Sequence, residues 1–215
     1  MRMTVAIDGP AGAGKSTIAK LLAERFNLMY INTGSMYRAV TLKALENNIS
    51  SNNVKLLMDV INIMEMHFEN NELILNGVNI NNELTLPKIS NSVSAYASVK
   101  EVREKLVEQM RAMSLKFNVI MDGRDIGTVV LKDANYKFFL TASAEERADR
   151  RYKELREKGL DVKYDIILED IKKRDYLDTN REVDPLKKAE DAIEIDTTGL
   201  NIEEVVNKIS GYMEK

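Results

Sequence analysis

The sequence lacks cysteine and tryptophan and has one histidine among its 215 residues. Without cysteine it can form neither disulfides nor thiolate-ligated metal sites, which is typical of proteins of a reducing cytoplasm. No apolar run approaches the roughly 18 residues of a membrane-spanning helix, and the N-terminal residues show no signal-peptide pattern. These absences predict a soluble, cytoplasmic protein that uses no membrane.

The sequence also lacks a large excess of positive or negative charge. Lysine and arginine number 31 against 34 aspartates and glutamates, so the net charge is −3. A general nucleic-acid binder is strongly basic, and this balance argues against nucleic acid as a partner. Any cationic site must therefore be local. The length and an apolar fraction of 44% favour one globular domain with inserts.

A phosphate-binding motif occupies residues 9–16, which match G-x-x-x-x-G-K-S/T at each fixed position and follow the apolar run Met3–Ile7. In this motif the backbone N–H groups turn towards phosphate oxygens, Lys15 reaches the β- and γ-phosphates, and the Ser16 hydroxyl ligates magnesium. The predicted nucleotide-binding residues of this loop are Gly9, Pro10, Ala11, Gly12, Ala13, Gly14, Lys15, Ser16 and Thr17.

The motif stands between a predicted strand and a predicted helix, so the phosphates would lie at a helix N-terminus. The residues expected on the apolar face of that helix are Ile18, Leu21, Leu22 and Phe26. Four more apolar runs alternate with helical patterns, at residues 28–31, 119–121, 137–140 and 192–195. This alternation predicts an α/β fold with a parallel sheet covered by helices.

Two of the covering helices can be placed from their residues. One spans about 99–116 and should pack on the sheet through Val99, Val102, Leu106, Met110 and Met113. The other begins after Ser143, because Ser143 and Glu146 form an S-x-x-E capping box, and Gly159 is expected just past its last turn.

The apolar period changes to two between about residues 64 and 82, which predicts a small antiparallel meander. Asn76-Gly77 suits a type I′ turn, and Asn70-Asn71 could form the other turn. We interpret the meander as an insert. His67 is expected to be a solvated strand residue, and the Asn- and Ser-rich residues 47–53 a loop.

Positive charge is dense between residues 147 and 188, where acidic residues are interleaved. Many of these side chains are expected on solvated helix faces with i,i+4 pairs. Arg147 and Arg151, however, lie four apart on one face, and Arg174 follows Ile167 and Ile171 on a stripe that should point inward. Arginines directed at a phosphate loop predict a closing lid.

The phosphate loop by itself fits a switch GTPase or a small-molecule kinase. A GTPase needs an N-K-x-D guanine motif, and the nearest string, residues 207–210, lacks the aspartate. Residues 196–199 match D-x-x-G, but too few residues follow them for the rest of a GTPase domain. A kinase is therefore favoured.

Several other segments resemble the bacterial cytidylate kinases. Residues 32–38, NTGSMYR, open a helix after the second predicted strand, and residues 122–130, DGRDIGTVV, follow the third. The lid segment 173–181, KRDYLDTNR, and the ending 192–198, AIEIDTT, are similar to the same family. The resemblance covers nearly the whole chain, with Asn32 where the family commonly has aspartate.

The resemblance implies a five-stranded parallel P-loop kinase core of residues about 1–60, 99–146 and 186–215. It also implies a nucleoside-monophosphate-binding antiparallel β insert of about 61–98 and a helical lid of about 147–185. The implied reaction transfers the γ-phosphate of ATP to CMP or dCMP with Mg²⁺, giving ADP and CDP or dCDP, and we expect a monomer.

Site residues are implied in the same way. The residues that would bind the acceptor phosphate are Arg38, Arg124 and Arg181, and those that would bind the cytosine are Thr33, Arg103 and Asp125. The sugar would be bound by Ser94, Arg174 and Asp178, and Tyr37 also belongs to the acceptor site. ATP would be bound by Arg147 and Arg151.

The chemistry agrees with these residues. A phosphate acceptor is already anionic, so the reaction needs cations and a water-poor site and no general base. The predicted catalytic group is Lys15, Arg124, Arg181, Arg174 and Asp122. Asp122, at the end of an apolar strand, is expected to hold magnesium through water beside Ser16; a turn-capping carboxylate is the alternative.

Base choice follows from hydrogen-bonding capacity. An ionised Asp125 can only accept, which suits the amino group of cytosine and opposes O4 of uracil, while Arg103 donates to N3 or O2. A kinase of the same architecture for UMP or another small acceptor is the remaining alternative.

Overall fold

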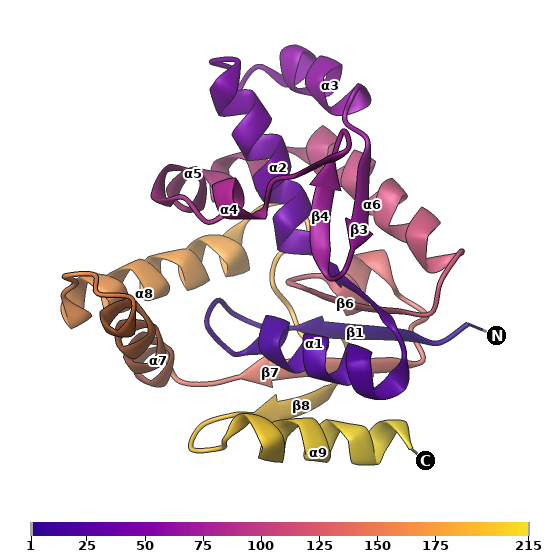
Figure 1. Ribbon diagram of the computed structural model, residues 1–215, viewed down its shortest axis with the longest axis vertical. Helices are drawn as coiled ribbons and strands as arrows, with labels where there is room; N and C mark the ends of the chain where they lie inside the picture. Colours follow the sequence, from indigo (N-terminus) through magenta and orange to yellow (C-terminus); the bar gives the residue numbers. More distant parts are fainter. Residues whose placement is uncertain (1, 215) are drawn as a thin grey trace.

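The computed structural model describes residues 2–214 and has a five-stranded parallel sheet at its centre (Figure 1). Its strands are β1 (Thr4–Asp8), β2 (Met29–Asn32), β6 (Val119–Gly123), β7 (Tyr136–Thr141) and β8 (Ile193–Asp196). The order across the sheet is β2-β6-β1-β7-β8. The predicted α/β fold and all five predicted strands are confirmed, and β1 lies in the middle, where it leads into the phosphate loop.

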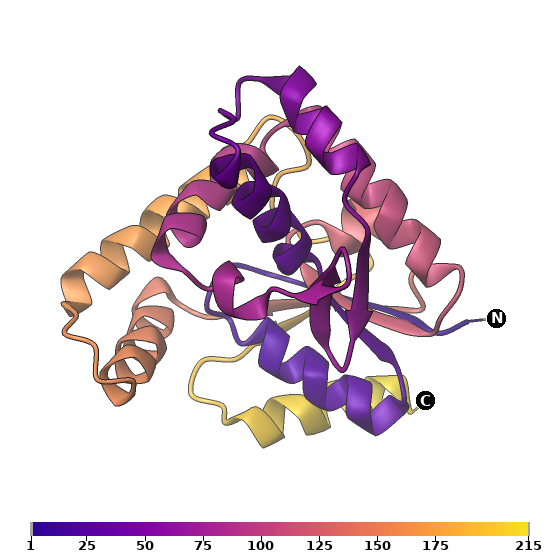
Figure 2. The same ribbon diagram turned by 45° about the horizontal axis from the view of Figure 1, so that its top comes forward.

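Helices cover both faces of this sheet. On one face lie α1 (Lys15–Phe26) and α9 (Ile202–Met213), and on the other α2 (Thr33–Glu46) and α6 (Lys100–Ser114) (Figures 1 and 2). The helix α3 (Val54–Asn62) packs against α2 and α6, away from the sheet. Along β1, Val5 and Ile7 enter the core with α1 and α9, whereas Ala6 enters the other core. Because both faces are buried, the strands are short continuous apolar runs.

The predicted apolar face of α1 is wrong at one position. Ile18 and Leu22 are buried, but Leu21 is 38% exposed. Ala19 and Ala23 are buried instead. They lie on the same face of the helix as Ile18 and Leu22, because residues spaced three or four positions apart form the stripe that faces the sheet.

The predicted helix at about 99–116 is α6, and it packs as expected. Val102, Leu106 and Met110 are buried in one core with Val119 and Met121 of β6. Within residues 2–214, no helix is long and apolar enough to cross a membrane.

The predicted meander is the antiparallel sheet of β3 (Met66–Glu69), β4 (Glu72–Leu75) and β5 (Val78–Asn79). Both turns have two successive residues with positive φ, 50° and 65° at Asn70 and Asn71, and 49° and 78° at Asn76 and Gly77. This is type I′ geometry, which the sequence predicts for Asn76-Gly77, and Asn70-Asn71 forms the other turn as expected. His67 is exposed, as expected, and α4 (Asn81–Leu84) and α5 (Pro87–Ala97) follow the sheet.

The lid region is a pair of helices, α7 (Ala144–Glu157) and α8 (Tyr164–Asn180), with a small core of its own that includes Ile167 and Ile171. The pair extends to one side of the sheet (Figure 1). Ser143 Oγ accepts the Glu146 N–H at 3.1 Å, so the Ser143 half of the predicted capping box is confirmed. The other half is wrong, because the Glu146 carboxylate accepts from Arg150 and not from the Ser143 N–H. Gly159 has a φ of +76° and ends the helix as predicted.

Candidate active site

The phosphate loop is packed closely against its neighbours. At Gly9, with a φ of +144°, a Cβ atom would lie 2.1 Å from the carbonyl oxygen of Leu140 in β7. At Gly12, with a φ of +78°, a Cβ atom would lie 3.3 Å from Cβ of Arg147. These contacts explain why the loop needs glycine at both positions.

Lys15, at the first turn of α1, is a buried cation. Its Nζ donates to the Pro10 carbonyl at 2.7 Å. Burial, followed by the nearby charge of Arg124, lowers the pKa of Lys15 well below its usual 10.5. A cation in this position is stabilised by an incoming anion.

Arg124 and Arg174 lie near Lys15, and Arg38 lies near both of these arginines. Burial, then Arg124, lowers the pKa of Arg174 to about 10, and the same two causes lower the pKa of Arg38. Within residues 2–214, the buried Nε of Arg174 has no hydrogen-bond partner. Neighbouring cations destabilise one another's charge, and the Arg174 Nε is a buried donor without an acceptor. A bound polyanion would supply both the negative charge and the acceptor, so these side chains suit a polyanion site.

Different elements hold these arginines in place. Arg38 of α2 donates to the Leu84 carbonyl at 2.9 Å and to Ser90 Oγ at 2.8 Å. Arg124, just after β6, donates through Nε to Asp178 Oδ2 of α8 at 2.7 Å. The site therefore connects the sheet, the helices α2, α4 and α5, and the lid.

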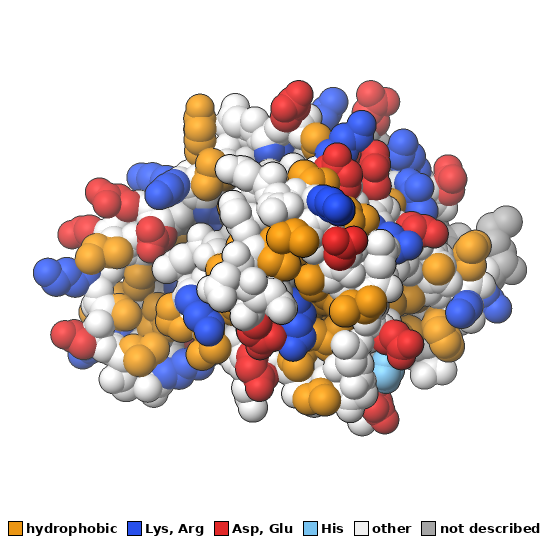
Figure 3. Space-filling view, turned by 90° about the horizontal axis from the view of Figure 1, so that it is seen from above, with side chains coloured by type: hydrophobic (Ala, Val, Ile, Leu, Met, Phe, Trp, Pro, Cys, Tyr) orange, Lys and Arg blue, Asp and Glu red, His pale blue; other side chains and the backbone are white. Residues whose placement is uncertain are grey.

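Over the surface seen in Figure 3, in contrast, Lys and Arg side chains alternate with Asp and Glu. The cations around Lys15 therefore form a local site, which is what the sequence requires of a protein with a net charge of −3.

Asp122 has a carboxylate suited to magnesium. Its Oδ2 accepts from Ser16 Oγ at 2.8 Å and its Oδ1 from the Tyr30 hydroxyl at 2.8 Å. Burial and then the Asp122 charge raise the pKa of Tyr30. Among residues 2–214, no group of three or more His, Cys, Asp or Glu side chains could hold a metal. A hydroxyl and one carboxylate fit Mg²⁺, which keeps several waters and uses few protein ligands.

The predicted base-binding residues form a closed network. Arg103 is 1% exposed and donates to the Asp125 carboxylate, to Asp184 Oδ2 at 2.8 Å and to the Ala97 carbonyl at 3.1 Å. Its guanidinium lies 5.3 Å from the centre of the Tyr37 ring. Arg181 donates to the other Asp125 oxygen at 3.3 Å. A base could reach Arg103 only by replacing one of these contacts.

Other predicted residues lie at the edges of this network. Thr33 Oγ1 donates to the Asp122 carbonyl at 2.7 Å, which ties Thr33 to the end of β6. Ser94 is half-buried on α5. Asn32, where the family commonly has aspartate, caps α2 by accepting the Ser35 N–H at 3.1 Å. The amide therefore performs a capping role that needs only an acceptor.

The two lid arginines differ. Arg147 is 4% exposed, donates to the Ala11 carbonyl of the phosphate loop at 3.0 Å, and makes a bidentate ion pair with Asp175. Arg151 has a half-exposed side chain and pairs with Glu154 at 2.8 Å. Of the two, Arg147 holds the loop, whereas the charge of Arg151 contributes to lowering the pKa of Arg38.

The sequence did not identify three carboxylates of this region, Asp8, Asp175 and Asp184, or the hydroxyl of Tyr30. Asp8 accepts the Ile126 and Gly127 N–H groups at 2.8 and 2.7 Å and so fixes the segment that bears Arg124 and Asp125. Burial raises its pKa to about 7. The sequence offered a signal for Asp8, because a carboxylate at the end of a buried strand lies beside the phosphate loop. It offered no such signal for Asp184.

A parallel sheet, a glycine-rich loop between its middle strand and a helix, and cations gathered over that loop define a P-loop phosphotransferase. The family model for cytidylate kinase matches residues 5–215. The chain belongs to the cytidylate kinase family.

Individual relatives agree with this assignment. The chain is 76% identical over 213 residues to a cytidylate kinase of Clostridium perfringens strain SM101, covering 99% of this chain and 98% of the relative. It is 62% identical over 215 residues to a cytidylate kinase of Clostridium acetobutylicum, covering 100% and 99%. A shikimate kinase structure from Bacteroides thetaiotaomicron has a TM-score of 0.53 at 12% identity, covers 99% of both chains, and supports the fold.

The resemblance found in the sequence is therefore confirmed, as are the enzyme class, a nucleoside monophosphate kinase, and the favoured reaction, ATP-dependent phosphorylation of CMP or dCMP. The switch GTPase and the kinase for another acceptor are the less favoured alternatives.

Proposed function

We propose that the cations around Lys15 carry the transfer of the ATP γ-phosphate to CMP or dCMP. The observations that support this proposal most directly are the buried Nε of Arg174, which has no hydrogen-bond partner among the described residues, and the pKa values of Lys15, Arg38 and Arg174, which burial and then the charge of Arg124 lower in each case. Two polyanions brought together here would neutralise charges that the protein leaves uncompensated, and charge compensation is the main demand of phosphoryl transfer.

The acceptor nucleotide would lie between the sheet and α8. Arg38, Arg124 and Arg181 would hold its phosphate, and Ser94, Arg174 and Asp178 its sugar, with Thr33, Tyr37, Arg103 and Asp125 at the cytosine. The contact between Arg124 and Asp178 supports this arrangement, because it places a phosphate-binding and a sugar-binding side chain next to each other.

ATP would bind along the phosphate loop, with Gly9 to Thr17 around its phosphates and Arg151 near it. Arg147 would act by holding Ala11 and the loop. Ser16 and Asp122 would hold Mg²⁺, Asp122 through water, and the ion would supply charge neutralisation at the β- and γ-phosphates. The α7–α8 lid would exclude water from the γ-phosphate, which limits hydrolysis.

We also propose that one chain is sufficient and that the enzyme is a monomer of the cytoplasm. The boundaries of the core, the acceptor-binding insert and the lid, at about residues 60, 99, 147 and 185, are proposed as the units that would move relative to one another.

Steady-state kinetics with CMP, dCMP, UMP and AMP test the proposal. The purified enzyme with ATP and Mg²⁺ should give the highest kcat/KM with CMP or dCMP and lose turnover when the metal is chelated. Equal kcat/KM for CMP and UMP, or ATP hydrolysis without acceptor phosphorylation, would contradict it. Light scattering of the eluted peak should give the mass of one chain, 24.4 kDa.

A further inference from the structure

Asp184, on the segment after α8, has a backbone conformation that calls for an explanation. Its φ is +49°, in the left-handed region that few residues other than glycine adopt. Pro185 follows it and restricts it further. Such strain persists where the surrounding contacts fix the residue firmly, so the contacts of Asp184 should show what the strain serves.

Asp184 holds two arginines at once. Its Oδ2 accepts from Nε of Arg103 at 2.8 Å. Its carbonyl oxygen accepts from Arg181, through Nε at 2.6 Å and through Nη2. Two residues further on, the Leu186 N–H donates to the Asp178 carbonyl at 2.8 Å and ties the segment back to α8. The left-handed turn therefore lets side chain and backbone of one residue bind both cations.

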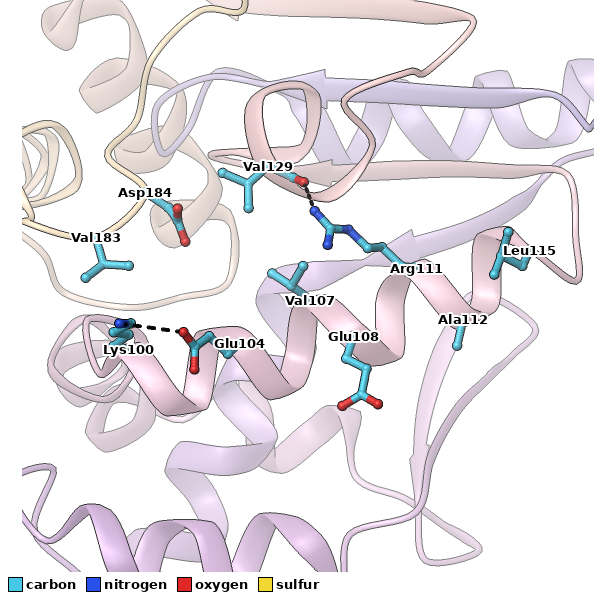
Figure 4. Close-up of a pocket in the computed structure, with 10 residues that line it drawn as sticks. All are labelled: Lys100, Glu104, Val107, Glu108, Arg111, Ala112, Leu115, Val129, Val183 and Asp184. Carbon is cyan, nitrogen blue, oxygen red and sulfur yellow. Dashed lines mark hydrogen bonds and ion pairs between the residues drawn. The ribbon is translucent and has the colours of Figure 1, made fainter.

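The resulting network balances two cations against two carboxylates. Arg103 pairs with Asp125 and Asp184, and Arg181 pairs with Asp125. The side chains of Arg103 and Asp125 are 1% and 6% exposed, whereas that of Asp184 is 27% exposed. In Figure 4, Asp184 lies between Val183 and Val129 above α6, at a surface hollow of about 670 Å³. Solvent therefore reaches Asp184 and not the buried pair.

Asp125 already pairs with both arginines, and Asp184 shares the charge of Arg103 with it. Loss of Asp184 would leave Asp125 as the one carboxylate paired with Arg103, and a carboxylate held more strongly by that cation is less free to accept from another donor. Cytosine differs from uracil by presenting an amino donor at this position, so the oxygens of Asp125 decide the choice between them. Compensation of Arg103 by Asp184 is thus a condition for base discrimination.

We propose that Asp184 is a positioning residue for base specificity: it compensates Arg103 so that Asp125 can accept the amino group of cytosine. The proposal rests on the proposed function, in which Arg103 and Asp125 address the base. It predicts an effect on CMP affinity and on the preference for CMP over UMP, with no effect on ATP.

The first test is Asp184→Asn, which keeps the size and the tolerance for left-handed φ and removes the charge. The KM for CMP should rise about tenfold, and the ratio of kcat/KM for CMP over UMP should fall, while kcat and the KM for ATP stay at wild-type values. Asp191→Asn is the matched control, because Asp191 pairs with Lys137 and belongs to no part of the network.

A second variant separates the carboxylate from the strain. Asp184→Gly adopts the left-handed conformation without cost but has no carboxylate. It should show the same rise in KM as Asp184→Asn. Wild-type kinetics in Asp184→Gly would overturn the proposal.

A double-variant cycle tests whether Asp184 acts through Arg103. In an Arg103→Lys background, Asp184→Asn should add little to the KM for CMP, because the two changes remove one shared interaction. Fully additive effects, or an unchanged CMP-over-UMP ratio in Asp184→Asn, would overturn the proposal while leaving the proposed function intact. Failure of the wild-type enzyme to prefer CMP would instead refute the proposed function itself.

Discussion

Arg124 donates through Nε to Asp178 Oδ2 at 2.7 Å, although the two residues lie 54 positions apart in the chain. The contact connects the end of β6, the strand next to the central β1, with α8 in the lid. Both side chains are largely buried, with 17% and 11% exposed. A change at Asp178 is therefore felt by the cations that surround Lys15.

Asp178→Ala should lower kcat/KM for both CMP and dCMP by about ten- to a hundredfold, since a hydrogen bond to a charged group contributes about 1.5–3 kcal/mol. The variant loses the proposed sugar contact and leaves Arg124 uncompensated beside Arg174 and Arg38. Asp149→Ala, which removes an exposed pair with Lys153 on α7, is the control. Unchanged values for both acceptors would remove Asp178 from the site.

Lys15→Ala should abolish most turnover, by orders of magnitude, because the β- and γ-phosphates lose their main cation. The melting temperature should stay the same or rise, since burial and Arg124 already disfavour the Lys15 charge in the free enzyme. Activity assays and thermal melts measure the two effects, with the exposed Lys208→Ala as control. Near wild-type turnover would refute the assignment of the phosphate loop.

Asp125→Asn should lower the ratio of kcat/KM for CMP over UMP by about one to two orders of magnitude. The amide can donate to O4 of uracil, which a carboxylate cannot. Both oxygens of Asp125 bind arginines, so the variant should also be less stable and less active on CMP. The ratio separates the two roles: an equal loss on both acceptors would mean that Asp125 only pairs with Arg103 and Arg181.

Asp8→Asn tests a pH dependence of stability. Burial raises the pKa of Asp8 to about 7, against 3.8 in an unfolded chain. Between these pH values the native protein binds a proton that the unfolded chain has released, so the free energy of unfolding contributed by Asp8 falls as the pH rises from 3.8 to about 7 and is level above.

Denaturant unfolding on both sides of pH 7 measures this slope. Asn cannot titrate, so the difference in the free energy of unfolding between wild type and Asp8→Asn should change between pH 3.8 and about 7 and be level above. Weakened contacts to Ile126 and Gly127 would lower the stability of the variant at every pH and would not produce this change. Asp133→Asn, an exposed position, should keep the wild-type slope. Parallel curves for wild type and Asp8→Asn would show that Asp8 stays ionised across the range.

The amino-acid sequence by itself determined the elements and the loop that binds phosphate. The strands, the type I′ turn at Asn76-Gly77, the second turn at Asn70-Asn71 and the capping of α7 by Ser143 agree with the structure. These features depend on side-chain period and on which residues tolerate positive φ, and both are properties of a few neighbouring residues.

The tertiary structure alone decided which charges meet. The family resemblance assigned Arg103 and Asp125 to the site, and spacing directed Arg174 inward, but neither named their protein partners. The sequence showed no sign that Asp184 would bind Arg103 from 81 positions away or that Asp8 would bind Ile126 from 118. Leu21 was assigned to the core for the same reason, because hydrophobicity does not show which face of α1 the sheet covers. An ion pair forms where packing brings two distant segments together and removes them from water, and that depends on the whole fold.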